Sequence, residues 1–313
     1  MQPAVTLTMN PALDVTAGTD RIVPGEKLRC SPPRHDPGGG GINVARALCL
    51  LGGSATAVFP TGGATGRLLE SLLTAEVVPC RTVAITGTTR ENFNIDEHRT
   101  GQQYRFIMPG PTLEADERRR CLDEAMGLMS FGGYFVASGS LPPGVPAGFY
   151  RHVGDRVRRA GGRFVLDSSG PALREIGTGN VFLLKANRAE LGEMLGRQIG
   201  DGHALEAAAA EAVAMGYADI VVLSLGAEGA LLADRHGCWW FAAVSVPVAS
   251  TVGAGDSMVA GILHRLALGA PIQEAVRYGI AAGAAALMRP GTELCRLEDT
   301  DRLFEQVPPP LRR

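Results

Sequence analysis

An aspartate that follows a glycine-rich turn is the residue best placed to do chemistry in this chain. The turn Gly253–Gly255 comes directly before Asp256, and the mostly apolar residues that follow predict a buried helix. Glycines let backbone N–H groups approach an anion closely, and the positive end of a helix adds to the attraction. An ionised Asp256 accepts a proton from a hydroxyl, so this segment is typical of phosphoryl transfer to an alcohol. Taken alone, the segment fits a simple helix cap equally well.

A second glycine run, Gly38–Gly41, also leads into an expected helix. No GK[ST] follows, so the run is not a Walker A loop, and Val44 breaks the GxGxxG dinucleotide pattern. The run therefore serves close packing or the approach of a small ligand to the backbone. Its spacing favours Asn43 as a helix cap over Asn43 as a hydrogen-bond donor to a sugar.

The composition is that of a globular chain of 313 residues with a formal net charge of −2. This charge creates no field for nucleic acid or an anionic membrane, and the one tight basic run, Arg118–Arg120, is interpreted as a solvated helix face. Neither a signal peptide nor a membrane-spanning apolar run is found, so we expect a cytoplasmic protein. The cysteines form no CxxC pair and the histidines no HxxxH pattern, so we expect reduced thiols and no zinc site.

Short β-branched runs alternate with amphipathic stretches, which predicts an α/β fold with a mainly parallel central sheet. The expected strands are Val5–Met9, Ala55–Phe59, Tyr134–Ser138, Arg163–Asp167, Val181–Lys185 and Asp219–Ser224. The expected helices are Ile42–Leu51, Glu114–Met129, Ala147–Ala160 and Ala204–Met215. Paired strands at Gly229–Asp234 and Gly237–Val246 predict an antiparallel edge. No linker or repeat divides the chain, so we expect a single domain over residues 1–313.

Two segments, about 14–36 and 85–109, do not follow this alternation. They contain strand-like pieces such as Glu91–Ile95 and Gln103–Ile107, with no helix between them. We expect them to form a small separate sheet. Beside a crevice at the carboxyl ends of the main strands, such a sheet serves as a lid, and it is also suited to dimer contacts.

Six motifs, taken in order, resemble those of the ribokinase-like (PfkB) carbohydrate kinases over essentially the whole chain. They are Asn10–Asp14, Gly38–Arg46, Ser138–Gly144, Lys185–Glu190, Ser224–Gly229 and the turn before Asp256. The resemblance implies a ribokinase-like three-layer sandwich with a small β-sheet lid, and ATP and Mg²⁺ as cofactors. A homodimer formed through the lid is also expected.

Within the family the chain is most similar to the ATP-dependent 6-phosphofructokinases of the isozyme II type. The segments that carry this likeness are the four-glycine run, Gly25–Cys30, Thr89–Asn92, Gln103–Gly110 and Asp167–Gly170. The likeness implies transfer of the ATP γ-phosphoryl group to fructose 6-phosphate, which yields fructose 1,6-bisphosphate in glycolysis.

The resemblance assigns roles on the sugar side of the site. Asp256 is the general base, and Gly253, Ala254 and Gly255 supply the anion hole. Asp14 accepts hydrogen bonds from sugar hydroxyls, as a carboxylate does well. Arg90 meets the substrate phosphate, a task that suits a guanidinium fork. The other implied contacts are Lys27 and Arg105 with the phosphate, Gly39, Gly40 and Asn43 with the sugar, and a hydroxyl from Ser138 or Ser140, with Ser138 favoured because it ends an expected strand.

The resemblance also assigns a nucleotide side. Lys185 and Asn187 organise the ATP phosphates, and Glu190 reaches Mg²⁺ through water, as suits a cation that keeps its waters. Alanine at position 186 replaces the usual proline, which leaves the local backbone uncertain. Further implied residues are Ser224, Gly226 and Gly229 for the triphosphate and ribose, Gly279 and Gly283 for the adenine, and Ser250, Val252, Ala286 and Gly291 for a K⁺ ion with Arg289 nearby.

Alternatives stay open. Within the family, the chain is alternatively a tagatose 6-phosphate kinase or a 1-phosphofructokinase. These kinases usually carry a lysine within the first glycine motif, where this chain has glycine. From other classes, a nucleotide-binding oxidoreductase is weakened by the absent GxGxxG pattern. A non-catalytic sugar-phosphate or nucleotide-binding protein is weakened by the joint presence of Asp256, its anion hole and the Asn187–Glu190 pair.

Overall fold

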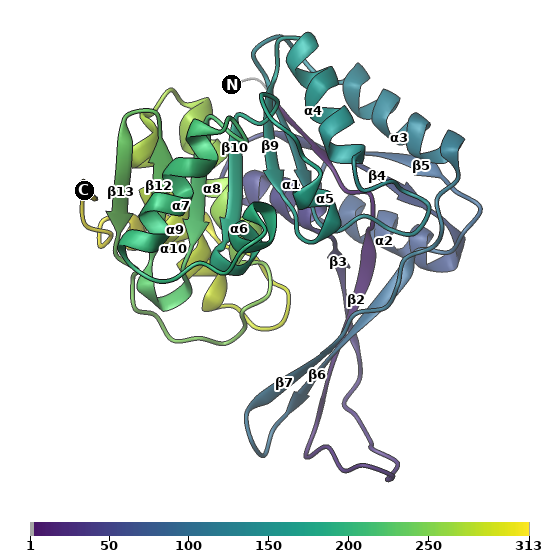
Figure 1. Cartoon of the computed structure of the whole chain (residues 1–313). Helices are drawn as coiled ribbons and strands as arrows, with labels where there is room; N and C mark the ends of the chain where they lie inside the picture. Colours follow the sequence, from purple (N-terminus) through teal and green to yellow (C-terminus); the bar gives the residue numbers. More distant parts are fainter. Residues whose placement is uncertain (1–2, 313) are drawn as a thin grey trace.

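The structure, a computed structural model, describes residues 3–312. Within them a ten-stranded sheet forms the centre of the molecule, in the order β14-β13-β12-β11-β10-β9-β8-β1-β4-β5 (Figure 1). All neighbours from β11 to β5 are parallel, and β12, β13 and β14 add an antiparallel edge. The parallel strands are β1 (Ala4–Leu7), β4 (Ala55–Thr61), β5 (Cys80–Ala84), β8 (Tyr134–Ser138), β9 (Arg163–Asp167), β10 (Leu183–Asn187) and β11 (Ile220–Ser224). The edge strands are β12 (Ala230–Asp234), β13 (Gly237–Phe241) and β14 (Leu311–Arg312).

Helices cover both faces of this sheet, because successive residues of its strands point to opposite sides and both sides are apolar. In β8, Val136 packs in one core and its neighbour Phe135 in the other. One layer holds α1 (Gly40–Leu50), α2 (Gly63–Ala75), α8 (Ala254–Ala267), α9 (Ile272–Leu287) and α10 (Leu297–Phe304). The other holds α3 (Ala115–Gly127), α4 (Phe149–Arg159), α5 (Pro171–Arg174), α6 (Arg188–Leu195) and α7 (His203–Ala214). The three-layer α/β sandwich expected from the sequence is confirmed.

A second sheet of four strands, in the order β3-β2-β6-β7, projects from the main body (Figure 1). Its strands are β2 (Ala12–Thr19), β3 (Arg34–Gly38), β6 (Arg90–Glu97) and β7 (Gln102–Phe106). The register places Asp14 between Asn92 and Asp36, and Arg105 opposite Asn94. Because side chains alternate along a strand, these polar residues share one face of the small sheet. The separate sheet predicted from residues 14–36 and 85–109 is therefore present.

Most expected strands and helices occur close to their expected positions, but the strand expected over Gly237–Val246 ends at Phe241. Among the elements that the sequence does not predict are β5, α10 and, most clearly, α2. Three glycines, at 62, 63 and 66, fall at or near its start, and glycine is a poor helix former. Leu69 and Leu73 are fully buried, so packing against the sheet stabilises this helix. No helix among the described residues is long and apolar enough to cross a membrane.

Candidate active site

The turn before Asp256 adopts the geometry that its glycines predict. Gly253 has a φ of 77°, in the left-handed region, and is the N-cap of α8. Asp256 lies in the first turn, so the amides of the first residues of α8 have no carbonyl acceptor one turn earlier in the helix. These N–H groups, at the positive end of α8, are available to bind an anion beside the Asp256 carboxylate.

Asp256 is half-buried, and the groups around it set its proton affinity. Burial, followed by the charge of Asp167, raises its pKa from 3.8 to about 6. A hydrogen bond of 3.0 Å from Asn43 Nδ2 to Asp256 Oδ2 and the charge of Lys185 act in the opposite direction. A carboxylate with a pKa near 6 is ionised at neutral pH and still has appreciable affinity for a proton, which suits a general base.

The prediction that Asn43 caps a helix is wrong. α1 begins at Gly40 with Gly39 as its N-cap, so Asn43 lies inside the helix and turns its side chain to Asp256. The start of this helix is closely packed, so glycine fits there and larger residues do not. A Cβ on Gly40 would lie 2.2 Å from Ser138 Oγ, and one on Gly41 would lie 2.6 Å from Thr8 Oγ1. Close packing by the glycine run is thereby confirmed.

Lys185, expected on the nucleotide side, also acts electrostatically on Asp256. Its Nζ lies 3.2 Å from Asp167 Oδ1, and a Cβ on Gly255 would lie 2.9 Å from the same Nζ. Burial lowers the pKa of Lys185, but the neighbouring carboxylates, led by Asp167, outweigh it and raise the pKa above its usual value. The ammonium is therefore charged directly beneath the proposed anion hole.

On the sugar side, Asp14 and Arg90 lie near each other where the small sheet joins the main body. Asp14 Oδ1 accepts a 2.9 Å hydrogen bond from Asn92 Nδ2, and burial raises the pKa of Asp14 against the charges of Arg105 and Arg90. The Arg90 guanidinium donates to Met108 O and Asn10 O, each at 2.9 Å, and burial lowers its pKa. A carboxylate and a preorganised guanidinium are thus brought together.

Three further sugar-side residues differ in how they are placed. Arg105 is exposed on β7 but acts electrostatically on Asp14. Lys27 is exposed in the connection between β2 and β3, which Figure 1 shows at the tip of the small sheet. Ser138 is only 2% exposed, beneath Gly40, whereas Ser140 is exposed and accepts a hydrogen bond from Asn10 Nδ2 at 3.1 Å. Of the two serines, Ser140 has the more accessible hydroxyl.

The Asn187–Glu190 pair forms a capping box at the start of α6. Asn187 Oδ1 accepts from Glu190 N at 2.9 Å, and Glu190 Oε2 accepts from Asn187 N at 2.7 Å. The strand β10 continues through Ala186, whose carbonyl accepts from Ser224 Oγ at 3.3 Å. The substitution of proline by alanine therefore leaves these side chains side by side.

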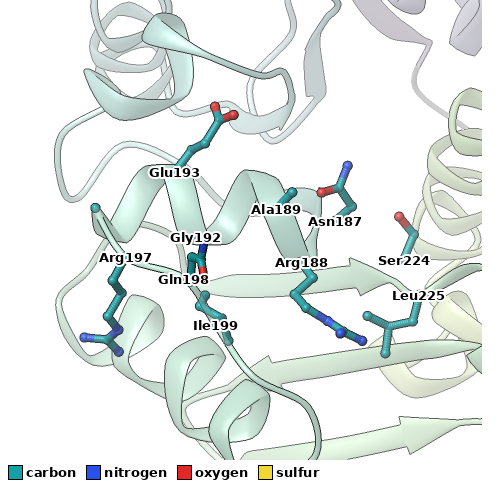
Figure 2. A pocket seen from close by; sticks show the side chains of 11 residues that line it. Asn187, Arg188, Ala189, Gly192, Glu193, Arg197, Gln198, Ile199, Ser224 and Leu225 are labelled. Carbon is teal, nitrogen blue, oxygen red and sulfur yellow. The ribbon is translucent and has the colours of Figure 1, made fainter.

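A pocket of about 900 Å³ adjoins this pair (Figure 2). It runs from Asn187 and Ser224 along α6 to Arg197–Ile199. Asp14, Arg90 and Asp256 do not line it, so the pocket neighbours the nucleotide side rather than the sugar side.

The remaining candidate residues lie on backbone turns and helix contacts. Gly226 and Gly229 have φ values of 60° and 99° around a short 3-10 turn, which explains glycine at both positions. A Cβ on Gly279 would lie 2.5 Å from Ile262 Cγ1 in α8, and one on Gly283 would lie 3.2 Å from Ala254 O. Both glycines therefore permit the close contact of α8 and α9, which by itself explains glycine at these positions.

The residues proposed for K⁺ come from two adjoining segments. The amides of Ala249 and Ser250 donate to Leu287 O, which holds the first segment against the end of α9. Ser250 and Val252 are buried, and Ala286 O accepts from the Arg289 amide. The Arg289 guanidinium pairs with Asp299 in α10, so its charge is offset there.

Two residues of the site were not assigned from the sequence. Asp167 ends β9 and lies next to Lys185 in the sheet register. Its position at the carboxyl end of an expected strand is the pattern that points to it. The other, Arg46, donates to Asn43 Oδ1 at 3.2 Å and was part of the second glycine motif without a role of its own.

Comparison with known proteins places the chain among carbohydrate kinases. An ATP-dependent 6-phosphofructokinase isozyme 2 of Mycobacterium tuberculosis is 49% identical, with 98% of this chain and 90% of the relative covered. The protein of the same name from Escherichia coli is 45% identical, with 96% and 97% covered.

Crystal structures of phosphofructokinase-2 from Escherichia coli superpose on nearly the whole chain. The complex with potassium has a TM-score of 0.93 at 43% identity, and the complex with fructose-6-phosphate 0.92 at 42%, each covering 98% of this chain and 99% of the other. A tetrameric inhibited form of the same protein also matches, with a TM-score of 0.92 at 43% identity and the same coverage. The family model described as pfkB family carbohydrate kinase matches residues 3–300, and the chain therefore belongs to that family.

Proposed function

We infer that the chain is an ATP-dependent 6-phosphofructokinase, which transfers a phosphoryl group from ATP to fructose 6-phosphate and yields fructose 1,6-bisphosphate. The observation that carries this inference is the half-buried Asp256 beside the anion-binding start of α8, with Asp14 and Arg90 available for a phosphorylated sugar. Relatives with this activity in their names, nearly half identical along the chain, support it.

In the proposed reaction, Asp14 accepts a hydrogen bond from the sugar and holds it in position while Arg90 binds its 6-phosphate. The Asp256 carboxylate accepts the proton of the 1-hydroxyl, whose oxygen forms the new P–O bond as the bond from the γ-phosphorus to ADP breaks. The first amides of α8 and the Lys185 ammonium stabilise the negative charge on the transferred group.

Two cations are proposed for this site. Glu190 has one carboxylate oxygen beyond its capping bond, which fits contact with Mg²⁺ through water, and the ion neutralises phosphate charge when bound. K⁺ is proposed for the carbonyl-rich segments at Ser250, Val252, Ala286 and Gly291. The adjoining 249–252 and 286–288 backbones and the Escherichia coli complex with potassium support it.

We also propose that residues 1–313 form one domain in which the small sheet is a lid and a dimer contact. Large apolar side chains exposed on this sheet and its connections support the dimer: Leu28, Phe106, Ile107 and Met108. One inhibited form of the Escherichia coli protein is tetrameric, and a tetramer can assemble from two dimers. A cytoplasmic location stays a prediction.

Release of ADP with Mg·ATP and a panel of acceptors tests the function. The acceptors are fructose 6-phosphate, tagatose 6-phosphate, fructose 1-phosphate and unphosphorylated fructose. We expect the highest kcat/KM with fructose 6-phosphate and a product that aldolase cleaves. A preference for either other sugar phosphate would make the chain a different kinase of the family, and no ADP release with any acceptor would make it a binding protein.

A further inference from the structure

An ion pair with a buried arginine and an exposed glutamate lies next to Asn43, the residue that donates to Asp256. Arg46, in α1, has a side chain that is 6% exposed, and its Nε and Nη2 donate to the two carboxylate oxygens of Glu76 at 2.6 and 2.7 Å. Glu76 is the C-cap residue of α2 and is 37% exposed. The remaining nitrogen, Nη1, donates to Pro37 O at 3.1 Å and to Asn43 Oδ1 at 3.2 Å. Glu76 thus fixes the plane of the guanidinium, and the guanidinium reaches Asn43.

This contact fixes the orientation of the Asn43 amide. A guanidinium only donates hydrogen bonds, so the amide oxygen of Asn43 must face Arg46. The amide nitrogen then faces the other way, where it donates to Asp256 Oδ2 at 3.0 Å. Four side chains from α2, α1 and α8 therefore form one hydrogen-bonded chain, Glu76–Arg46–Asn43–Asp256.

The orientation matters for a general base. An N–H donor on Oδ2 stabilises the ionised carboxylate and leaves Oδ1 to take the substrate proton. A reversed amide would set its oxygen against the carboxylate, which repels the charge and removes the anchor of Oδ2. The other charged groups that act on Asp256 are Asp167, Lys185 and Asp14.

We propose that Arg46, held by Glu76, is a positioning residue for phosphoryl transfer that acts through the orientation of the Asn43 amide. Its hydrogen-bond partners are Glu76, Pro37 O and Asn43, so it reaches Asp256 only through Asn43. The alternative is a purely structural role, in which the ion pair only ties α1 to α2. The two roles predict different results for variants in which Asn43 has already been removed.

A double-mutant cycle separates the two roles, and it rests on the proposed activity toward fructose 6-phosphate. Arg46→Met is expected to lower kcat by roughly ten-fold or more, the size of a lost hydrogen bond to a charged group. In an Asn43→Ala background the same substitution should cost less than about two-fold, because the interaction it supports is already absent. Equal losses in both backgrounds would overturn the proposal.

The pH profile supplies a second readout that a structural role does not move. In the pH profile of kcat, the fall on the acidic side (the acidic limb) should move to higher pH by roughly half a unit to one unit in Arg46→Met. The reason is that the Asp256 carboxylate loses its hydrogen-bond donor, the Asn43 amide, which raises the pKa of Asp256. Glu76→Gln keeps one oxygen that accepts a hydrogen bond from the Arg46 guanidinium, so it should show a smaller shift in the same direction. An unmoved limb in both variants would contradict the proposal.

Two further variants keep the test decisive. Arg265→Met removes another Arg–Glu pair, with Glu274, and should change thermal stability without moving the acidic limb. Should Arg46→Met not fold, Arg46→Lys and Glu76→Gln carry the same pH test with smaller changes of structure. If the wild type phosphorylates fructose 6-phosphate but the double-mutant cycle is additive, only the positioning role of Arg46 is rejected. If the wild type does not phosphorylate fructose 6-phosphate, the proposed function itself is rejected.

Discussion

Asp256 illustrates how single residues reach their roles through their surroundings. Its identity and its place after two glycines were evident in the sequence, and its raised pKa follows from burial beside Asp167. Its contact with Asn43 could not be predicted, because 213 positions separate the two residues and only the packing of α1 on α8 brings them together. The same packing places Asn43 inside a helix instead of at its cap.

The first prediction concerns the pH dependence of turnover. The proposed base works only as a carboxylate, and the pKa of Asp256, about 6, lies above its ordinary value, so kcat should be full above that pH and fall as the pH drops through it. Initial rates at saturating substrates over about pH 5 to 8 measure this limb. A kcat that stays constant down to about pH 5 would mean that burial does not raise the pKa of the base.

Arg90 should govern binding of the sugar phosphate more than chemistry. Arg90→Met is expected to raise KM for fructose 6-phosphate by roughly ten-fold or more and to change kcat less, because the phosphate is remote from the reacting hydroxyl. Arg99→Met, at an exposed arginine between β6 and β7, is the control and should leave KM unchanged. An unchanged KM in Arg90→Met would show that the phosphate binds elsewhere.

At the scale of elements, the parallel strands other than β5 and the small sheet follow from residue patterns, because β-branched runs and turn residues mark them. The helix α2 does not, since its glycines weaken the local preference and its buried leucines matter only once the sheet exists. The ion pair of Arg46 with Glu76 could not be predicted either, because Glu76 is the C-cap residue of α2.

The glycine run at the start of α1 gives a test of element packing. Gly40→Ala should reduce the free energy of unfolding by about 1 to 3 kcal/mol, because the added Cβ meets Ser138 Oγ at 2.2 Å and the helix must shift. Gly127→Ala, at a helical glycine of α3 where an added Cβ would meet nothing within 4 Å, should be neutral or stabilising. Urea unfolding of both variants makes the comparison. Equal stability of the two would argue against the tight contact.

At the scale of the whole molecule, each of the two sheets supplies a different part of the candidate site. The large sheet brings Asp167 and Lys185 beside the start of α8, and the small sheet brings Asp14 close enough to act electrostatically on Asp256. The small sheet and its connections also expose four large apolar side chains, Leu28, Phe106, Ile107 and Met108, which are the basis for the proposed dimer.

Ile107, which follows β7, is 56% exposed and tests that dimer. Ile107→Asp should shift the protein from dimer to monomer in analytical ultracentrifugation, because an unpaired charge in an interface is costly. Phe131→Asp, at an 83% exposed position on the main body, should leave the mass unchanged. A monomeric wild type, or a variant that sediments like the wild-type dimer, would remove the small sheet as the contact.

The central claim is that Asp256 is the base that deprotonates fructose 6-phosphate, and turnover by Asp256→Asn tests it most directly. We expect a loss of roughly 10²-fold to 10⁴-fold or more in kcat, while equilibrium dialysis shows that fructose 6-phosphate still binds. The melting temperature above pH 6 should be no lower than that of the wild type, because the raised pKa of Asp256 means that its buried charge opposes folding there. A folded variant that forms fructose 1,6-bisphosphate at nearly the wild-type rate would contradict the claim.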